Sequence, residues 1–277
     1  MYSIIAVLLF SNLFVCFRVY SSNESELRVY FLDVGQGDAI LIESPTQGRV
    51  LIDGGPDRKV LSELGRVLPF GDRQIDVIIE SHPDADHITG LVEVMNRFDV
   101  DTFVSTGMRS TNSLDETLDE VIQEKEINKI QAKRGVSIDL GGGAVLTILY
   151  PSGSIEGLET NEASIVSKLT LDEMDFILTG DSTKLAEYKL LSLNKELLDS
   201  EVLQVGHHGS DTSSSLLYVQ AVSPEYSVIS SGKDNRYGHP HKVTLDTLNK
   251  IKTNILNTAD VGRILFKTDG EKLEVEY

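Results

Sequence analysis

The sequence contains few of the residue types that form covalent or stacking sites. Its 277 residues include a single cysteine, Cys16, and no tryptophan. One cysteine excludes an intramolecular disulfide framework and a cysteine-based structural zinc site. No G-x-S-x-G serine motif occurs, so a covalent mechanism has no clear nucleophile. Without tryptophan, tyrosine and phenylalanine must supply any platform on which nucleic-acid bases stack.

Positive charge is also scarce. The chain has 25 lysine and arginine residues against 43 aspartate and glutamate residues, which gives a formal net charge of −18. This charge favours solubility and opposes a broad electrostatic attraction to nucleic acid or anionic membranes. It does not exclude a phosphate-bearing substrate, because bound metal ions can reverse the potential inside a site.

Long apolar runs are confined to the N-terminus. MYSIIAVLLFSNLFVCF precedes Arg18 and is followed by a small, polar segment. We predict that residues 1–20 are a signal peptide or N-terminal membrane anchor and that residues 21–26 are a linker. A packed N-terminal strand or helix is the alternative. The prediction makes the protein secreted or membrane-anchored with its domain outside the cytoplasm, and membrane contact is limited to this segment. No protein partner is predicted.

From residue 27 to residue 277, strand and helix patterns are interspersed. Apolar runs joined by glycine-rich or acidic turns predict several hairpins, for example residues 164–181. Helical spacing occurs at residues 57–68 and 88–98. We see hairpins but no long parallel series, a pattern that predicts packed sheets with helices outside them in one domain.

The six histidines fall in three pairs rather than being scattered along the chain. Each pair follows an apolar strand pattern, in the segments SHPDADHITG (81–90), VGHHGS (205–210) and GHPH (238–241). The first segment also carries Asp84 and Asp86, and Asp181 follows another apolar run in LTGD. Imidazole and carboxylate groups that converge from several strand ends are typical ligands of zinc, manganese and iron. Considered singly, Asp84 and Asp86 have helix capping as their alternative role, and Asp181 is equally typical of a turn or a cap.

The order of these motifs resembles the metallo-β-lactamase superfamily of metallohydrolases. More narrowly, it resembles the C-terminal domain of the competence protein ComEC and its stand-alone relatives. The matching segments run from Val29 nearly to the C-terminus: FLDVGQGDAILIE, LIDGG, SHPDADHITGL, LTGD, VGHHGS and SGKDNRYGHPH. The resemblance implies a four-layer αββα sandwich with a two-metal hydrolytic site at one edge of the sheets.

The resemblance also implies a set of metal ligands. His82 and Asp84 would bind a first divalent ion, Asp86 and His87 would bind a second, and Asp181 would bridge both.

A late histidine would complete the second metal set. We favour His207, nearer the strand end, with His208 as a catalytic or substrate contact. Asp53 in LIDGG would support the metal loop. Other side chains are expected to orient the ligands or touch the substrate: Gln36, Asn161, Ser164, Tyr237 and Lys242.

The chain departs from the family pattern at two points. Position 84 is aspartate where most of the superfamily has histidine, and no histidine occurs between His87 and His207. The corresponding region, NEASIV, offers only Asn161 and Ser164 as substitutes. Oxygen ligands shift metal preference from zinc toward manganese or magnesium. The resemblance implies two divalent ions, and we expect them to be zinc or manganese.

Two such ions would generate a metal-bound hydroxide near neutral pH. The predicted catalytic groups are Asp86, His208, His239 and His241. Lys233, Arg236 and Lys242 make the last histidine segment the most cationic stretch of an acidic chain, which predicts an anion clamp.

These features predict a phosphodiesterase or nuclease that acts on single-stranded DNA. One alternative is a hydrolase of another substrate class, such as an envelope phosphodiester, an ester or a lactam. Another is a metal-binding module without catalytic activity, because a fold alone does not fix function.

Overall fold

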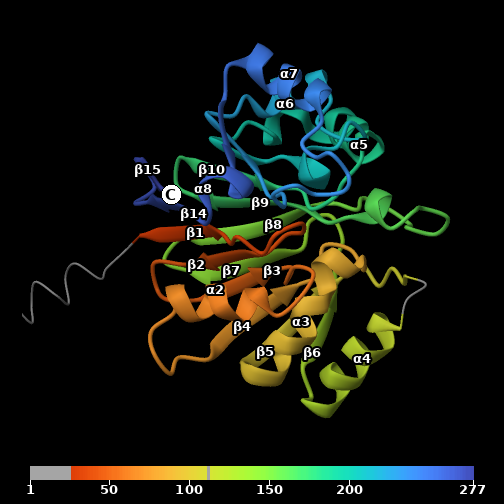
Figure 1. The fold of residues 1–277 in the computed structure, drawn as a ribbon, viewed down its shortest axis with the longest axis vertical. Coiled ribbons are helices and arrows are strands. Elements are labelled where there is room, and N and C mark those ends of the chain that lie inside the picture. The colour runs from red at the N-terminus through yellow and green to blue at the C-terminus, as the bar shows by residue number, and fades with distance from the viewer. Residues whose placement is uncertain (1–25, 111–112) are drawn as a thin grey trace, which may run out of the picture.

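The computed structural model describes residues 26–110 and 113–277. These residues form two sheets packed face to face between two layers of helices (Figure 1). This architecture confirms the four-layer αββα sandwich. The predicted leader and the linker up to residue 25 lie outside the described residues. Within the described part of the chain, no helix is both long and apolar enough to cross a membrane.

Eight of the strands that the structure describes form the first sheet. They are β1 (Leu27–Phe31), β2 (Ile40–Glu43), β3 (Arg49–Ile52), β4 (Gln74–Ile79), β5 (Asp99–Ser105), β6 (Asn128–Gln131), β14 (Ile264–Thr268) and β15 (Leu273–Glu276). Their order is β15-β14-β1-β2-β3-β4-β5-β6. Strands β3 to β6 are parallel, and the remaining neighbours are antiparallel.

The second sheet has seven strands in the same described ranges. They are β7 (Ser137–Gly141), β8 (Ala144–Tyr150), β9 (Val166–Leu171), β10 (Met174–Leu178), β11 (Val202–Gln204), β12 (Tyr226–Ile229) and β13 (Asn254–Asn257). Their order is β13-β12-β11-β10-β9-β8-β7. Here β10 to β13 are parallel, whereas β7 to β10 alternate in direction.

Helices cover the outer face of each sheet (Figure 1). The first sheet is covered by α2 (Lys59–Val67), α3 (Ala85–Arg97) and α4 (Leu114–Glu124), and the second by α5 (Lys184–Asn194), α6 (Leu216–Val222) and α7 (Lys242–Ile251). A short helix, α8 (Thr258–Val261), follows β13, and single 3-10 turns occupy Asn161–Ala163, Lys195–Leu197 and Gly206–Gly209.

Alternation along the strands separates the layers. In β1, Val29 and Phe31 belong to the cluster between the sheets, whereas Tyr30 belongs to the cluster beneath the helices of the first sheet. In β2, Ile42 and Leu41 divide in the same way. Successive side chains of a strand point to opposite faces, so each apolar strand is buried on both sides. The resulting core holds both sheets rigidly and fixes the loops at their edges.

The prediction that the chain lacks a long parallel series is wrong. Each sheet contains four consecutive parallel strands. Three of these strands escaped detection because their apolar signal is weak. Strand β5 starts with alternating exposed and half-buried residues, β6 is exposed at every position, and β13 is only partly buried. The carboxyl ends of parallel strands meet at one edge, where α/β proteins bind their ligands.

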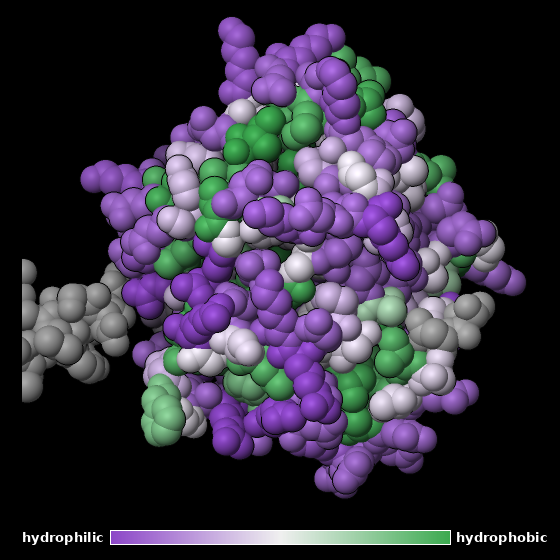
Figure 2. Space-filling model, in the orientation of Figure 1, coloured by the Kyte–Doolittle hydropathy of each residue, from purple (hydrophilic) through white to green (hydrophobic). Residues whose placement is uncertain are grey.

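Hydrophilic residues dominate the molecular face shown in Figure 2, with separate, small apolar areas between them. This surface agrees with the formal net charge of −18.

Candidate metal centre

Three strand ends bring the predicted ligands to one edge of the two sheets. Strand β4 leads to His82 and the first turn of α3, β10 leads to Asp181, and β11 leads to the pair His207–His208. The sheets are tied together here, because the backbone N–H of Ile165 donates to the carbonyl oxygen of Ser81 at 2.9 Å. Side chains from both sheets therefore converge on one point.

One oxygen of Asp181 faces two buried imidazole rings. Asp181 Oδ1 lies 3.5 Å from His87 Nε2 and 3.4 Å from His208 Nε2. His208 Nε2 also lies 3.5 Å from Oδ2 of Asp86. We call Asp86, His87 and His208, together with Asp181 Oδ1, the inner half-site.

The second oxygen of Asp181 faces a different set. Asp181 Oδ2 lies 3.8 Å from His82 Nε2 and 3.5 Å from His207 Nε2. His82 Nε2 is in turn 3.7 Å from Oδ2 of Asp84. We call His82, Asp84 and His207, together with Asp181 Oδ2, the outer half-site. Asp181 is the one side chain that the two half-sites share.

Four atoms of this cluster are buried without a hydrogen-bond partner in the described structure: His82 Nε2, His87 Nε2, His208 Nε2 and Asp181 Oδ1. Buried polar atoms nearly always have a partner, so four such atoms facing one another need an explanation. Two groups of three ligand atoms, each within 4.8 Å of one another, share His87: His82, His87 and Asp181 form one, and Asp86, His87 and His208 form the other. Imidazole nitrogens and carboxylate oxygens at this spacing fit divalent metal ions.

The far side of each inner imidazole is held by an acceptor. His87 Nδ1 lies 2.9 Å from Oδ2 of Asp53, and His208 Nδ1 lies 2.9 Å from the carbonyl oxygen of Ser230. A carbonyl oxygen can only accept, so Nδ1 of His208 carries a proton, and Nε2 is the nitrogen that would bind a metal after losing its own proton. Asp53 also accepts from the backbone N–H and the hydroxyl of Ser81, at 2.8 and 2.6 Å. Asp53 thus lies behind His87, on the side of the ring opposite Nε2.

His82 is oriented by two serine hydroxyls. Its Nδ1 lies 3.0 Å from Ser81 Oγ and 3.2 Å from Ser164 Oγ. The Ser81 hydroxyl already donates to Asp53, so its oxygen accepts from the His82 ring. Ser164 Oγ additionally accepts the backbone N–H of Asp181 at 3.1 Å. Ser164 therefore orients both a ring and the shared aspartate and lies behind the ligand atoms.

Sequence reasoning missed Asp38, which is 2% exposed between the two inner histidines. Its carboxylate lies 3.9 Å from His87 Nδ1 and 3.8 Å from His208 Nδ1, and it accepts a hydrogen bond from Gln204 Nε2 at 2.8 Å. Asp38 thus lies on the Nδ1 side of both rings, opposite their free Nε2 atoms. The motif VGQGDA contained the signal, because it placed an aspartate beside the glycine turn between two strands.

The charges of the cluster stabilise one another. Burial lowers the pKa of His208, but the carboxylates of Asp181 and Asp38 outweigh this effect and raise the pKa to about 9. Burial raises the pKa of Asp86, but the nearby His208 ring, 3.5 Å away, and the charge of His87 lower that pKa to about 2. A divalent ion must displace such imidazole protons, so metal binding here releases protons.

His207 and His208 occupy different half-sites because of the local backbone. Both have left-handed conformations, with φ of 51° and 54°, so the chain turns sharply between β11 and the next loop. His207 Nδ1 lies 2.8 Å from Thr212 Oγ1, and its Nε2 lies 3.3 Å from Asn161 Nδ2. We expected His207 in the second metal set, but the structure places His208 beside Asp86 and His207 on the opposite side of Asp181.

The two residues of the last histidine pair, His239 and His241, also differ in position. The His239 ring lies 5.6 Å from the His207 ring and 6.3 Å from the His208 ring, and its Nδ1 is buried without a hydrogen-bond partner among the described residues. Burial, followed by the charges of His207 and His208, lowers the pKa of His239 to about 4. His239 is therefore neutral at neutral pH and lies at the margin of the cluster.

His241 and Lys242 are not brought into the cluster. His241 Nδ1 accepts the backbone N–H of Asp211 at 3.0 Å, and its Nε2 lies 3.3 Å from the carbonyl oxygen of Tyr237. Lys242 pairs with Asp246 at 2.6 Å, one turn along α7. His241 is the N-cap of this helix and Lys242 its first residue, and in the described structure their contacts are with Asp211, Tyr237, His239 and Asp246. The geometry therefore gives His241 no contact with the reacting centre and leaves Lys242 outside the expected anion clamp.

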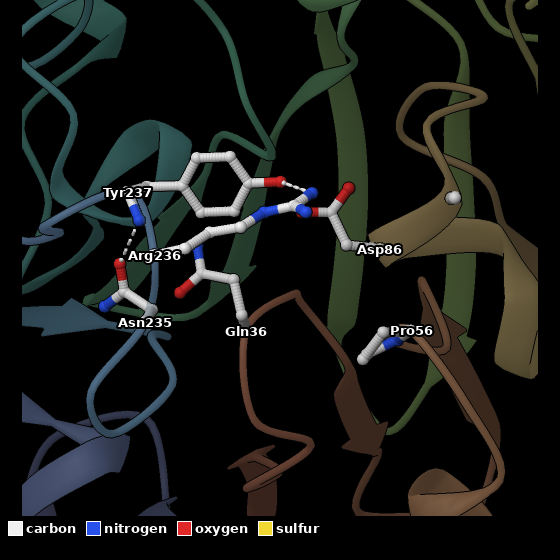
Figure 3. Close-up of a pocket in the computed structure, with 7 residues that line it drawn as sticks. Gln36, Pro56, Asp86, Asn235, Arg236 and Tyr237 are labelled. Carbon is white, nitrogen blue, oxygen red and sulfur yellow. Dashed lines mark hydrogen bonds between the residues drawn. The ribbon is translucent and has the colours of Figure 1, made fainter.

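A cavity of about 440 Å³ opens beside the inner half-site (Figure 3). Its lining residues come from the β1–β2 loop, the loop after β3, the start of α3 and the loop after β12: Gln36, Pro56, Ala85, Asp86, Asn235, Arg236 and Tyr237. In Figure 3 the Arg236 guanidinium lies between Tyr237 and Asp86. Its Nη2 donates to the Tyr237 hydroxyl at 2.6 Å. The cavity therefore has a cation, an aromatic ring and a candidate metal ligand on its walls.

A family model, the metallo-beta-lactamase superfamily, matches residues 32–233. The chain belongs to this superfamily. Together with the buried ligand cluster, this membership identifies a metal-dependent hydrolase whose ligands suit divalent ions. The resemblance to the metallo-β-lactamase superfamily that the sequence motifs indicated is confirmed.

Curated relatives support the same family. The chain is 30% identical to the ComE operon protein 3 of Bacillus subtilis (strain 168), over 90% of this chain and 34% of the relative. It is 29% identical to the competence protein ComA of Neisseria gonorrhoeae, over 94% of this chain and 35% of the relative. The chain thus spans about a third of the length of these curated relatives.

Solved structures share the fold. Igni18, a metallo hydrolase from Ignicoccus hospitalis, superposes with a TM-score of 0.56 at 13% identity, covering 90% of this chain and 99% of its own. A diphosphatase from the PhnP family has a TM-score of 0.52 at 15% identity, covering 87% and 98% of the two chains. At these identities the likeness shows the fold alone.

Proposed function

We propose that this protein is a metal-dependent phosphodiesterase that cleaves single-stranded DNA. The observation that carries the proposal is Asp181, whose two carboxylate oxygens face two different sets of ligand atoms. Two ions flanking one carboxylate are suited to in-line displacement at a phosphodiester. The competence proteins among the relatives direct the substrate proposal toward DNA.

The proposed ligand allocation follows the two half-sites. Asp86, His87 and His208 would hold one divalent ion, and His82, Asp84 and His207 would hold the other, with Asp181 between them. Ions bound there would act as Lewis acids and activate water for attack. Each set combines imidazole with carboxylate, a composition that suits zinc or manganese.

The cavity beside the inner half-site is the proposed substrate subsite. Arg236 lies against the Tyr237 ring, with Cζ 4.8 Å from the ring centroid, and its guanidinium extends toward Asp86. Arginine binds phosphate oxygens in a planar, bidentate manner, and a tyrosine ring stacks on any base. Gln36 Oε1 accepts the backbone N–H of Gly232 at 3.0 Å, which leaves its buried Nε2 as a donor without a partner in the described structure.

His239 is the proposed group that assists the leaving oxygen. It is the histidine outside the two half-sites that lies nearest to them, and its ring stacks on Tyr237 with centroids 5.6 Å apart. A neutral imidazole at this position can donate a hydrogen bond to an oxygen on which charge develops.

The test is hydrolysis of a labelled oligothymidylate by the protein with manganese, beside an EDTA control. We expect metal-dependent cleavage that is lost in Arg236→Ala and retained in Lys233→Ala, a change of charge in the same loop. Cleavage that persists in EDTA would contradict the proposed chemistry. Metal binding without cleavage of the oligonucleotide or of bis(p-nitrophenyl) phosphate would contradict the proposed substrate class.

The proposed place of action is outside the cytoplasm, through the apolar segment within residues 1–20. Fractionation of cells that produce the full chain tests this proposal. We expect the protein in the envelope or medium, and a cytosolic pool alone would contradict the proposal.

A further inference from the structure

A second groove lies on the same edge of the two sheets as the metal centre. It has a volume of about 400 Å³ and is bordered by the ends of β5, β6 and β8. No acidic side chain is among its lining residues: Thr106, Gln131, Ala132, Lys133, Arg134, Pro151, Ser152, Gly153, Ser154 and Ile155. In a chain with a net charge of −18, a groove with two cations and no carboxylate is a local reversal of charge.

Strand register places this groove relative to the metal centre on the first sheet. Ile79 pairs with Val104, and Val104 pairs with Ile130. The ends of β4 and β6, which lead to His82 and to Lys133, therefore lie at the same level, two strands apart. Two strand spacings amount to about 10 Å.

In the second sheet the groove is also two strands from the metal centre. Tyr150 at the end of β8 pairs with Val166, and Ser167 in β9 pairs with Leu178 near the end of β10. The segment that begins at residue 151 thus lies two strands from the loop that carries Asp181. The walls are joined across the sheets, because the backbone N–H of Arg134 donates to the carbonyl oxygen of Pro151 at 2.8 Å.

The two cations of the groove are available for a ligand. Lys133 and Arg134 are both exposed, and neither has an ion-pair partner among the residues that the structure describes. The neighbouring cations differ, since Arg109 and Lys129 both pair with Asp119. Three groove residues, Thr106, Ser152 and Ser154, add hydroxyl groups that can donate to phosphate oxygens.

We propose that the Lys133–Arg134 groove is a second phosphate-binding site, which holds the backbone of a single-stranded nucleic acid on the side of the metal centre opposite Tyr237. Strand order supports the geometry, because β12 leads to Tyr237, β10 and β11 lead to the ligands, and β8 leads to this groove. A nucleic-acid strand held on both sides of the metal centre would cross Asp181 in one direction. This inference rests on the proposed function and adds the path of the polymer.

The test compares the double variant Lys133→Glu/Arg134→Glu with Lys125→Glu. Lys125 is also exposed and without an ion pair in the described structure, but it precedes β6 and lies at the opposite edge. Binding of a fluorescent oligothymidylate is measured by anisotropy over a range of salt concentrations in EDTA. Hydrolysis of the oligothymidylate and of bis(p-nitrophenyl) phosphate is measured with manganese.

We expect the double variant to bind the oligothymidylate at least about tenfold more weakly, with a salt-dependence slope smaller by about 1.4, because each lost phosphate contact on a single strand removes about 0.7. KM for the oligothymidylate should rise by a similar factor while kcat is unchanged. Hydrolysis of bis(p-nitrophenyl) phosphate should stay at the wild-type rate, because this small diester does not reach the groove. Lys125→Glu should behave as wild type in all assays.

The three results that would overturn the groove proposal are distinguishable from one another. If wild type cleaves the oligothymidylate but the double variant binds and cleaves it as Lys125→Glu does, the groove has no role and the nuclease proposal stands. If wild type neither binds nor cleaves the oligothymidylate, both the groove and the nuclease proposal are overturned. Equal loss on the polymer and on the small diester would show a structural effect and would also overturn the inference.

Discussion

The two half-sites share Asp181 but are supported differently. In the inner half-site, His87 and His208 are 0% and 2% exposed, and their Nδ1 atoms meet Asp53 and the carbonyl oxygen of Ser230. In the outer half-site, His207 is 25% exposed and its ring is held by the hydroxyl of Thr212.

The difference predicts that two metal sites built from these similar ligands would be unequal. Partners behind a ligand fix its ring orientation and raise its basicity, and charged partners do so more strongly than neutral ones. The carboxylates of Asp38 and Asp53 lie behind the inner ligands, whereas hydroxyl groups lie behind the outer histidines. We therefore expect the inner half-site to bind metal more tightly and to be more sensitive to mutation.

Removing the carboxylate that the two half-sites share should impair both of them. Asp181→Asn keeps the shape but loses the charge that faces both half-sites, so we expect hydrolysis to fall by at least about 10³-fold. Steady-state kinetics with manganese measures the effect. Asp172→Asn, at the other end of the same hairpin, is the control and should have wild-type activity. Wild-type turnover in Asp181→Asn would refute the shared-ligand assignment.

Exchanging single histidines should show which half-site dominates. Asparagine tolerates the left-handed backbone at both positions, so His208→Asn and His207→Asn are matched changes. We expect His208→Asn to lose about 10²-fold or more in kcat/KM and His207→Asn to lose clearly less. The reverse order would mean that His207, as the sequence suggested, belongs with Asp86.

The support behind the inner half-site can be weakened without removing a ligand. Asp53→Asn leaves His87 in place but removes the negative charge behind it, so we expect metal affinity or activity to fall about 10-fold to 100-fold. Isothermal titration with manganese measures the affinity, and Asp33→Asn, an aspartate outside the cluster, serves as control. An unchanged affinity would show that Asp53 is not part of the metal support.

Metal titration should resolve the two half-sites in the unmodified protein. Manganese added to EDTA-treated protein should bind in two phases whose affinities differ at least about tenfold, the range that outer-layer partners control. His207→Asn should weaken the second phase and leave the first intact. A single phase of one ion, unaffected by this variant, would leave the outer half-site without a metal.

The smallest expected effect lies at the rim of the outer half-site. Asn161 Nδ2 is 3.3 Å from His207 Nε2. This hydrogen bond uses the His207 lone pair that a metal would take, and one neutral hydrogen bond is worth about 1 kcal/mol, so Asn161→Ala should change activity by about fivefold or less. A loss as large as that of His208→Asn would place Asn161 among the ligands.

Much of the site could be predicted because its residues follow strand ends. The segment HPDADH and the aspartate of LTGD both stand directly after apolar strands, and the structure brings these residues together. The path of the chain beyond a strand is harder to predict. Two left-handed residues decide which of His207 and His208 faces Asp86, and no periodic pattern reports such a turn.

The remaining differences have equally local causes. Strand β6 is exposed throughout, so its sequence has no apolar alternation that would predict a strand, and the parallel series went undetected. His241 stands at the N-cap of α7, and Lys242 pairs with Asp246 along that helix. Asp38 lies outside the histidine segments, and only the folded loop brings it behind His87 and His208.

The most direct test of the shared aspartate is anomalous diffraction at the manganese absorption edge from crystals of the protein grown with manganese. We predict two peaks that flank the carboxylate of Asp181, the stronger one beside Asp86, His87 and His208 and the weaker one beside His82, Asp84 and His207. No peak at Asp181, or a single peak on the Asp38 side of the histidine rings, would contradict the account.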